Sequence, residues 1–349
     1  AISLRCRRCE ADHPLIATGV CSKCFAPLEP VYDREAQRAR ISRASIQGGP
    51  LNIWRYADLL PVAAPAEQRL APGMTPLVAA PRLARALGVG ELYIKTDTAN
   101  PTHSFKDRVV AVACAKALEL GMDTLACSST GNLANAVAAR AAAEGIEGVV
   151  FVPADLEPEK LLATAVYGAT LYAVQGTYDD CSRLNVELSF ELPWGFVNTN
   201  LRSYYAEGSK TIAYEIVEQL GWELPTAVVS PIASGALYAR LAKGFGEFID
   251  LGLVEGTLPR IYGGQAEGCH PVVSAFEDDR RVVPVRPNSI ARSLAIGSPA
   301  DGDIAVETAK LTKGKIYSVP EEDIGTNMAL LAEQAGVFGE TAAGVTLGA

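Results

Sequence analysis

The sequence predicts an α/β protein, with parallel sheets covered by helices on both faces, preceded by a small cysteine-rich segment. Three observations support this prediction. The 349 residues suffice for two domains and an appendage. From about Gly90 onward, short apolar runs alternate with longer amphipathic or alanine-rich runs, as strands alternate with helices in such folds. The first 30 residues are instead polar, rich in turns and contain four cysteines.

Composition narrows the class of protein. Hydrophobic residues make up 49% of the chain and charged residues 20%, which is typical of a globular protein. The net charge of -9 and the absence of a basic stripe argue against nucleic acid as a partner. No apolar run is long enough to span a bilayer, and no secretory signal is evident, so we expect no membrane partner. Scattered single cysteines favour a reducing, cytoplasmic location.

The individual elements follow from the alternating pattern. The expected strands lie at 90–97, 123–129, 148–156, 170–177, 194–200, 226–234 and 260–268. The expected helices start near residue 104 and lie at 131–145, 157–168, 178–190, 206–221 and 236–252. Ligands of parallel α/β sheets bind beyond the carboxyl ends of strands, where helices begin. Four junctions meet this description: 100–108, 128–135, 198–208 and 231–237.

The chain end is unusual for this architecture. Its last residues, "GVFGETAAGVTLGA", read as a loop that enters a helix. An α/β domain normally adds at least one more strand after such a helix, so we expect the C-terminal end to be incomplete.

Two cysteine pairs mark the N-terminal segment. Cys6 and Cys9 form one C-x-x-C knuckle, Cys21 and Cys24 form another, and eleven residues separate them. Four thiolates from two such turns make a closed tetrahedral site that suits a structural Zn²⁺ and leaves no open position for catalysis. The alternatives are two disulfides, or a ribbon that has lost its metal.

Lys106 stands at the wrong end of its predicted helix for a cation. It follows a strand and Asn-Pro, and it opens an apolar helix whose first turn is electropositive. Burial and the helix N-terminus both favour a neutral amine, which is a nucleophile able to form a Schiff base. An ordinary exposed lysine is the alternative. Nearby His103 is best explained as a turn residue with an unusual backbone angle, rather than as a phosphate ligand or proton shuttle.

Two further junctions suit anions. Ser129, Thr130 and Gly131 lie between a strand and a helix, where backbone N–H groups and hydroxyls could hold a carboxylate or phosphate. The loop 231–237 has the same character. An ordinary N-cap turn is the alternative for each. Together with a Schiff-base lysine on one side of a parallel sheet, they indicate pyridoxal phosphate as a cofactor.

Several blocks of the sequence resemble one family. "NPTHSFKDR", "SSTGNLANA", "VNTN", "AEGSKT", "GGQAEGC" and "SIARSLAIGSPADG" closely resemble the threonine synthases, which belong to the fold type II pyridoxal-phosphate enzymes. The resemblance runs from about Leu70 to the end, and some members carry a cysteine-rich N-terminal extension. It implies two doubly wound domains of the tryptophan synthase beta-like class and a homodimer.

The resemblance also implies site residues. Lys106 would form the Schiff base with pyridoxal 5'-phosphate, and Asn132 would bind the phenolic oxygen of the cofactor. The remaining expected contacts are as follows: Ser129, Thr130 and Gly131 with the substrate carboxylate, Ser234, Gly235, Ala236 and Leu237 with the cofactor phosphate, Asn198, Thr199 and Arg202 with the substrate phosphate, and Ala295 and Ile296 near the ring.

The chain departs from the family pattern at some positions. His103 stands where the family usually has glycine, the loop at 234–237 has fewer Gly and Asn residues, and the loop before "AEGSKT" is one residue longer. The family's C-terminal "TG-x-GLK"-type segment is absent. The expected parts of the chain are a four-cysteine zinc-ribbon-like segment at 1–30, a connector and arm at 31–88, a small α/β domain at 89–200 and a large α/β domain at 201–349.

The resemblance implies a reaction. O-phospho-L-homoserine and water would give L-threonine and phosphate by γ-elimination and β-addition, a lyase reaction of threonine biosynthesis. The alternatives are another pyridoxal-phosphate enzyme of the same fold, such as a cysteate synthase or a threonine/serine dehydratase, and a non-catalytic truncated homologue.

Overall fold

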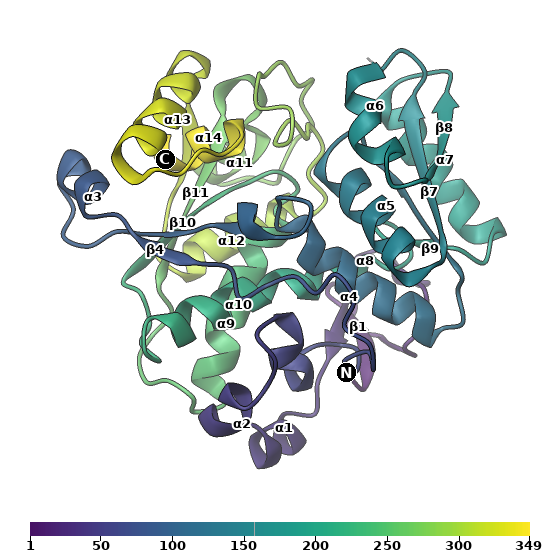
Figure 1. Cartoon of the computed structure of the whole chain (residues 1–349), viewed down its shortest axis with the longest axis horizontal. Helices are drawn as coiled ribbons and strands as arrows, with labels where there is room; N and C mark the ends of the chain where they lie inside the picture. Colours follow the sequence, from purple (N-terminus) through teal and green to yellow (C-terminus); the bar gives the residue numbers. More distant parts are fainter. Residues whose placement is uncertain (157) are drawn as a thin grey trace. The chain divides into compact units, whose positions relative to one another are not determined.

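The computed structural model describes residues 1–156 and 158–349 (Figure 1). The chain divides into two compact units, which we describe one at a time. Unit 1 comprises Ala1–Met74 and Asp97–Thr211, and unit 2 comprises Thr75–Thr96 and Ile212–Ala349. Residue 157, where the sequence predicts the start of a helix, lies outside the described residues.

Unit 1 begins with a small antiparallel sheet and three short helices. The sheet has the strand order β2-β1-β3, and the turns that carry the cysteines adjoin its strands. The elements are β1 (Ser3–Cys6), β2 (Asp12–His13), β3 (Leu28–Val31), α1 (Arg34–Arg40), α2 (Arg43–Gln47) and the 3₁₀ helix η1 (Ile53–Leu59). Leu4, Cys6 and Leu28 are buried and belong to the same apolar core as the larger sheet of this unit.

The larger sheet of unit 1 is parallel, with the order β8-β7-β6-β9. Its strands are β6 (Thr124–Ser128), β7 (Glu147–Pro153), β8 (Thr170–Val174) and β9 (Gly195–Phe196). Its helical elements are η2 (Asp97–Ala99), α4 (Lys106–Glu119), α5 (Asn132–Glu144), α6 (Pro158–Ala165), α7 (Tyr178–Glu191), α8 (Arg202–Glu207) and η3 (Gly208–Lys210). Each strand and helix predicted here from the sequence is present in the described residues.

Helices cover both faces of this sheet. Successive side chains of a strand point to opposite faces, so neighbouring residues of one strand pack against different helices. On one face Leu125 and Cys127 of β6 pack with apolar residues of α4 and α5. On the other face Ala126 of β6 and Phe151 of β7 pack with Cys181 of α7. This two-sided covering confirms the predicted doubly wound α/β class.

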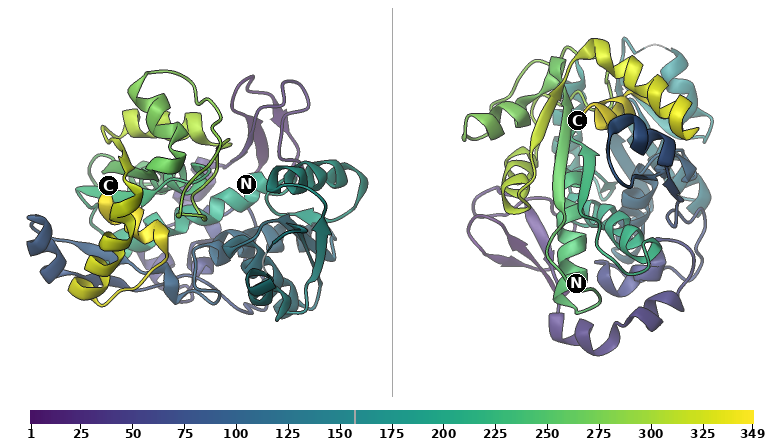
Figure 2. Two further views of the ribbon diagram at one scale, coloured as in Figure 1. Left: turned by 90° about the horizontal axis from the view of Figure 1, so that it is seen from above. Right: turned by 90° about the vertical axis from the view of Figure 1, so that its left-hand side faces the viewer.

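Unit 2 contains a second parallel sheet, with the order β10-β11-β12, whose strands run side by side in the right-hand view of Figure 2. Its strands are β10 (Ala227–Pro231), β11 (Arg260–Ala266) and β12 (Ile316–Val319). Its helical elements are α9 (Thr211–Gln219), whose first residue belongs to unit 1, α10 (Ala236–Asp250), η4 (Glu267–Cys269), α11 (Pro271–Glu277), α12 (Gly302–Leu311), α13 (Glu321–Ala335) and α14 (Thr341–Gly348).

One strand differs from the prediction. The run 90–97 was expected to open the parallel series, but β5 (Tyr93–Lys95) pairs antiparallel with β4 (Leu77–Ala79) in a separate two-stranded ribbon. Among the described residues, β5 pairs with β4 and with no strand of either parallel sheet. The ribbon therefore lies outside the parallel sheets.

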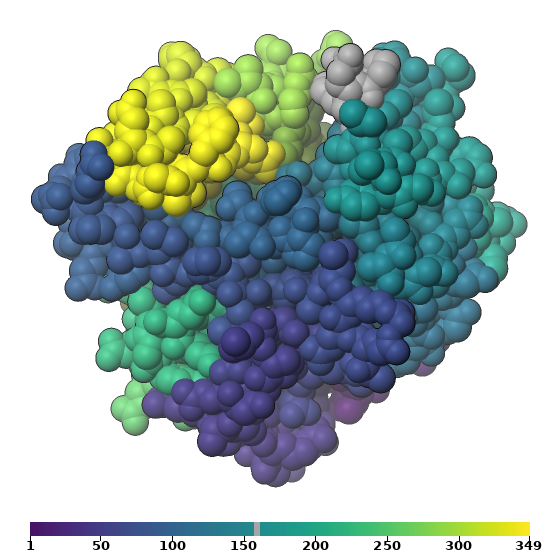
Figure 3. All heavy atoms as spheres, in the orientation of Figure 1, coloured from purple at the N-terminus to yellow at the C-terminus, as the bar shows by residue number. Residues whose placement is uncertain are grey.

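The arm and the C-terminal helices share an apolar cluster within unit 2. Leu83 of α3 (Pro81–Leu87) packs with Leu331 of α13, and Leu347 of α14 lies against the same cluster. The space-filling view shows the blue arm beside the yellow C-terminal helices (Figure 3). The helix predicted to begin in the last residues of the chain is α14.

Glu321 at the start of α13 fastens two loops of unit 2. Its carboxylate accepts the N–H of Gly268 at 2.9 Å and that of Ile290 at 2.9 Å. Burial alone would raise the pKa of Glu321, but these hydrogen bonds lower it below the usual value.

No helix among the residues that the structure describes has both the length and the apolar character needed to cross a bilayer.

Candidate active site

The turn that carries the lysine is held by its own side chains. The buried amide of Asn100 accepts the N–H of Gly73 at 2.9 Å. Thr102 donates both its N–H and its hydroxyl to the Asp107 carboxylate, at 2.8 and 3.0 Å. Burial, only partly offset by these two hydrogen bonds, raises the pKa of Asp107. The turn therefore presents the first residue of α4 from a fixed backbone.

His103 adopts the left-handed conformation predicted for it, with φ of 61°. Its side chain is exposed, and Nδ1 lies 3.2 Å from the carbonyl oxygen of Thr98. This is the backbone angle for which glycine is best suited, and histidine is among the side chains that tolerate it. The structure agrees with a turn role for His103.

Lys106 is the first residue of α4, as predicted, and it is half-buried. Its Nζ donates to the hydroxyl of Tyr205 at 3.1 Å and lies 4.7 Å from the centre of the Phe105 ring. The second cation of this turn, Arg108, is completely buried and makes a two-point ion pair with Asp97, at 2.7 and 2.8 Å. Arg108 thus stabilises the fold, whereas the Lys106 amine faces the aromatic hydroxyl of Tyr205.

The loop Ser129–Gly131 lies at the carboxyl end of β6, and Asn132 opens α5. Gly131 occupies the N-cap position, so no N-cap side chain competes for the first-turn N–H groups of α5. Cys127 precedes this loop and is fully buried, and this burial raises the pKa of its thiol.

Asn198 and Thr199 lie beside the same strand end. The amide of Asn198 donates to the Ser128 carbonyl at 3.4 Å. The buried side chain of Asn185, on α7, donates to the Thr199 hydroxyl at 2.6 Å and to Asn198 Oδ1 at 3.4 Å. Arg202 follows as the first residue of α8. Within unit 1 the structure therefore brings together the carboxyl ends of β6 and β9. These strand ends precede the residues predicted to bind the substrate carboxylate and the substrate phosphate.

The loop Ser234–Leu237 belongs to unit 2, where it joins the carboxyl end of β10 to α10. Gly235 is the N-cap of α10, with φ of 93°, and a Cβ there would lie 2.5 Å from the carbonyl oxygen of Asp301. Only glycine fits this position. The N–H of Asp301 donates to the Ser234 carbonyl at 2.8 Å, which fixes the loop. Ala295 and Ile296 lie in the same unit, in the irregular segment before α12.

These features fit pyridoxal phosphate. A half-buried lysine at a helix start can carry the cofactor, and hydroxyls and helix N-termini whose N-cap is glycine can receive its anionic groups.

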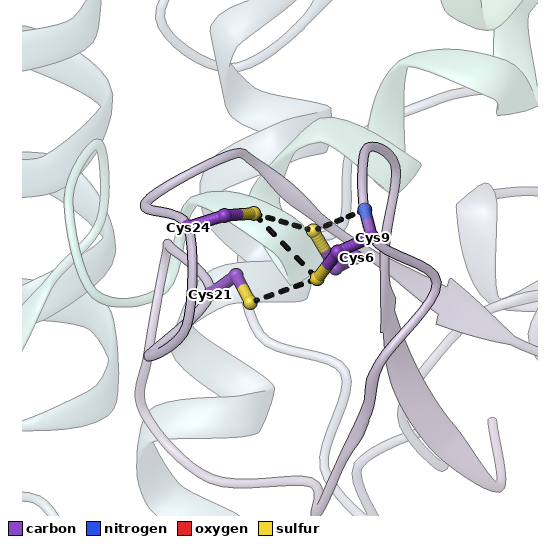
Figure 4. A group of neighbouring side chains, drawn as sticks. All are labelled: Cys6, Cys9, Cys21 and Cys24. Atoms are coloured by element: carbon purple, nitrogen blue, oxygen red, sulfur yellow. Dashed lines mark hydrogen bonds between the residues drawn. The ribbon is translucent and has the colours of Figure 1, made fainter.

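The four N-terminal cysteines converge (Figure 4). Their Sγ atoms all lie within 4.8 Å of one another, and the Cys6–Cys24 and Cys9–Cys21 pairs are 3.4 and 3.6 Å apart. A tetrahedron with Zn–S distances of about 2.3 Å has sulfur separations of about 3.8 Å. All four cysteines are free, so the alternative of two disulfides is not the arrangement found.

Backbone N–H groups donate to sulfur atoms of this cluster. Arg8 and Cys9 donate to Cys6 Sγ at 3.4 and 3.5 Å, and Lys23 donates to Cys21 Sγ at 3.3 Å. Although burial opposes it, hydrogen bonds from the backbone and from neighbouring thiols lower the pKa of Cys6 to about 6, whereas the hydrogen bonds that Cys9 shares with the other sulfurs raise its own pKa. The donor set, its spacing and its hydrogen bonds fit a structural Zn²⁺.

Three contacts near the candidate site were missed from the sequence. Tyr205 touches Lys106, Asn185 supports Thr199, and Gly19 of the N-terminal segment packs against Thr199. No local spacing signals any of them, since each joins separate parts of the chain.

Comparison with known proteins agrees with this geometry. A family model described as "Pyridoxal-phosphate dependent enzyme" matches residues 68–349. The threonine synthase of Methanocaldococcus jannaschii is 33% identical over 342 residues, covering 97% of this chain and 84% of that protein. The threonine synthase of Methanosarcina acetivorans is 34% identical over 350 residues, covering 99% and 85%.

A solved structure shares the fold. The processed form of threonine deaminase isoform 2 from Solanum lycopersicum superposes with a TM-score of 0.69 at 19% identity, covering 92% of this chain and 80% of that one. With most of its length matched by both the family model and its relatives, the chain belongs to the pyridoxal-phosphate-dependent enzyme family and, within it, to the threonine synthases.

Proposed function

We propose that this protein is a threonine synthase, which converts O-phospho-L-homoserine and water to L-threonine and phosphate with pyridoxal 5'-phosphate as cofactor. The main support is the identity of 33% and 34% to two threonine synthases over nearly the whole chain. The arrangement of unit 1 adds to it, because the hydroxyl-bearing loop and the amide-bearing loop meet at the end of β6, and Lys106 contacts Tyr205 on the helix that follows the amide-bearing loop.

Lys106 would hold the cofactor through its amine, and Asn132 would bind the phenolic oxygen of the cofactor. Ser234, Gly235, Ala236 and Leu237 would bind the cofactor phosphate through the start of α10, a helix of 15 residues. When bound, pyridoxal phosphate supplies an electron sink for the carbanion at Cα of an amino acid.

Lys106 would also act as the general base that removes the proton from Cα. This role requires a neutral amine, and Lys106 lies at the start of α4, where the helix dipole is positive. The hydroxyl of Tyr205, 3.1 Å from Nζ, would orient the amine whenever it is released.

The substrate would be held by residues of unit 1. Ser129, Thr130 and Gly131 would bind its carboxylate at the start of α5. Asn198, Thr199 and Arg202 would bind its phosphate. The overall charge of -9 does not oppose a doubly anionic substrate, because these donors and helix termini act locally.

The cluster of Cys6, Cys9, Cys21 and Cys24 would bind a structural Zn²⁺ with no open position. The domain boundaries at 89–200 and 201–349 and the homodimer stay predictions. Light scattering on the holoenzyme measures the oligomeric state.

The proposed reaction is tested by incubating the holoenzyme with O-phospho-L-homoserine and measuring threonine and phosphate. We expect the two products in equal amounts. A cysteate synthase would instead consume phosphoserine and sulfite, and a dehydratase would form a 2-oxo acid from threonine. Either of these activities without threonine formation would contradict the proposal.

A further inference from the structure

The loop between the two cysteine knuckles, residues 14–20, lies on the proposed substrate-phosphate loop. We call residues 14–20 the ribbon tip. Gly19 of the tip packs directly against Thr199: a Cβ on Gly19 would lie 2.1 Å from the Thr199 carbonyl oxygen and 3.8 Å from Cβ of Arg202. Any side chain at position 19 must displace either the tip or the backbone of Thr199.

A hydrogen bond fastens the ribbon tip to α8. The hydroxyl of Tyr204 donates to the Ile16 carbonyl at 2.9 Å, and the Tyr204 side chain is completely buried. Leu15 of the tip packs against the same apolar core as Leu201. The segment around Arg202 is thus held to the tip by a hydrogen bond on one side and by the close approach of Gly19 on the other.

Thr199 is also fixed from its other side. Asn185 donates to its hydroxyl at 2.6 Å, and the Thr199 N–H donates to the Phe196 carbonyl at 3.0 Å. Because the hydroxyl oxygen accepts from Asn185, its own proton is directed to a different acceptor. The backbone carbonyl of Thr199 lies against Gly19. The ribbon tip and the Asn185 side chain together therefore determine the direction in which the Thr199 hydroxyl proton points.

We infer that the ribbon tip is a positioning element for recognition of the substrate phosphate, with Gly19 and Tyr204 as positioning residues. This inference rests on the proposed function. The inference predicts a selective effect. Disturbing the tip should weaken the binding of ligands that carry a phosphate and leave the binding of amino acids without a phosphate unchanged. The N-terminal extension is then part of the substrate site and not only an appended ribbon.

The experiment compares Gly19→Ala and Tyr204→Phe with the control Gly90→Ala, whose added methyl group meets open space. KM and kcat are measured with O-phospho-L-homoserine. Binding of L-threonine, which has no phosphate, is followed by the change it causes in cofactor absorbance. For both Gly19→Ala and Tyr204→Phe we expect KM to rise about tenfold, as for a weakened hydrogen bond to a charged group, with kcat within about twofold of wild type. The affinity for threonine and all parameters of Gly90→Ala should not change.

Two results would overturn the inference. One is an unchanged KM in Tyr204→Phe, which alters one hydrogen bond and serves as the decisive variant if Gly19→Ala does not fold. The other is an equal loss of affinity for threonine and for the phosphorylated substrate, which would indicate general destabilisation. The activity of the wild-type protein distinguishes these results from failure of the proposed function. A wild-type protein that forms no threonine contradicts the proposed function. If the wild type is active, the variants test the role of the tip alone.

Discussion

Replacement of Lys210 by methionine should strongly destabilise unit 1. The Lys210 ammonium and the Glu207 carboxylate are 2.8 Å apart, and both side chains are completely buried. The hydroxyl of Tyr32 donates to Glu207 at 2.7 Å and accepts from Lys210 at 3.1 Å. This triad joins the "AEGSKT" motif to the segment that follows the cysteine-rich sheet.

The size of the effect follows from this geometry. At 2.8 Å and an effective dielectric constant near 20, two unit charges attract by about 6 kcal/mol before the cost of desolvation. In Lys210→Met the carboxylate stays buried without its ammonium partner, so we expect a loss of about 3–5 kcal/mol in the free energy of unfolding. Methionine preserves most of the side-chain volume, so cavity formation contributes little.

Urea unfolding of the purified holoenzyme, followed by circular dichroism, measures this loss. The matched control is Arg183→Met, which removes a cation that pairs with the acid three residues before it, Asp180, at 2.6 Å. Because 68% of the Arg183 side chain is exposed, its removal should change the free energy of unfolding by less than about 1 kcal/mol. Equal effects in the two variants would refute the reasoning that burial decides the strength of these pairs.

Three other sites give predictions of their own. Asn185→Leu removes the hydrogen bond to Thr199, so it should raise KM for the phosphorylated substrate about fivefold, as steady-state kinetics would measure. It should cost little stability in thermal unfolding, because it also removes a buried carbonyl oxygen that has no partner among the described residues. Cys24→Ser should abolish zinc binding, measured by elemental analysis, while Cys269→Ser, outside the cluster, should retain about one zinc ion per chain. Glu321 has a folded-state pKa below the usual 4.5, so the stability it contributes is present above that pH and is lost as the pH falls through the folded value. Glu321→Gln should therefore flatten the fall in thermal stability below pH 5, and an unchanged slope would contradict this.

Much of the fold could be predicted because its elements are locally encoded. The strand β6 is buried throughout around the apolar run Leu125–Cys127, and α5 is an alanine-rich helix that ends at Gly145 in the left-handed conformation. The partner of a strand is not encoded in this way. The pairing of β5 with β4 and the addition of β12 to the second sheet depend on contacts between distant segments, so the sequence pattern gave no sign of them.

The same distinction applies to the candidate site. Lys106 and the loop at Ser129 were predictable, because each lies at a strand-to-helix junction whose residue types are locally unusual. The contact of Lys106 with Tyr205 spans 99 residues, and that of Tyr204 with Ile16 spans 188. Such contacts arise only from tertiary packing, which explains why Tyr205 and the ribbon tip were not predicted.

The central claim is that Lys106 carries pyridoxal phosphate. Borohydride reduction of the holoenzyme, followed by proteolysis and mass spectrometry, fixes the cofactor on the lysine to which it is attached and identifies that lysine. The predicted result is a pyridoxyl group on the peptide containing Lys106, and loss of the visible cofactor absorbance in Lys106→Ala. A modified peptide containing a different lysine, such as Lys210, or a Lys106→Ala variant that keeps the absorbance, would contradict it.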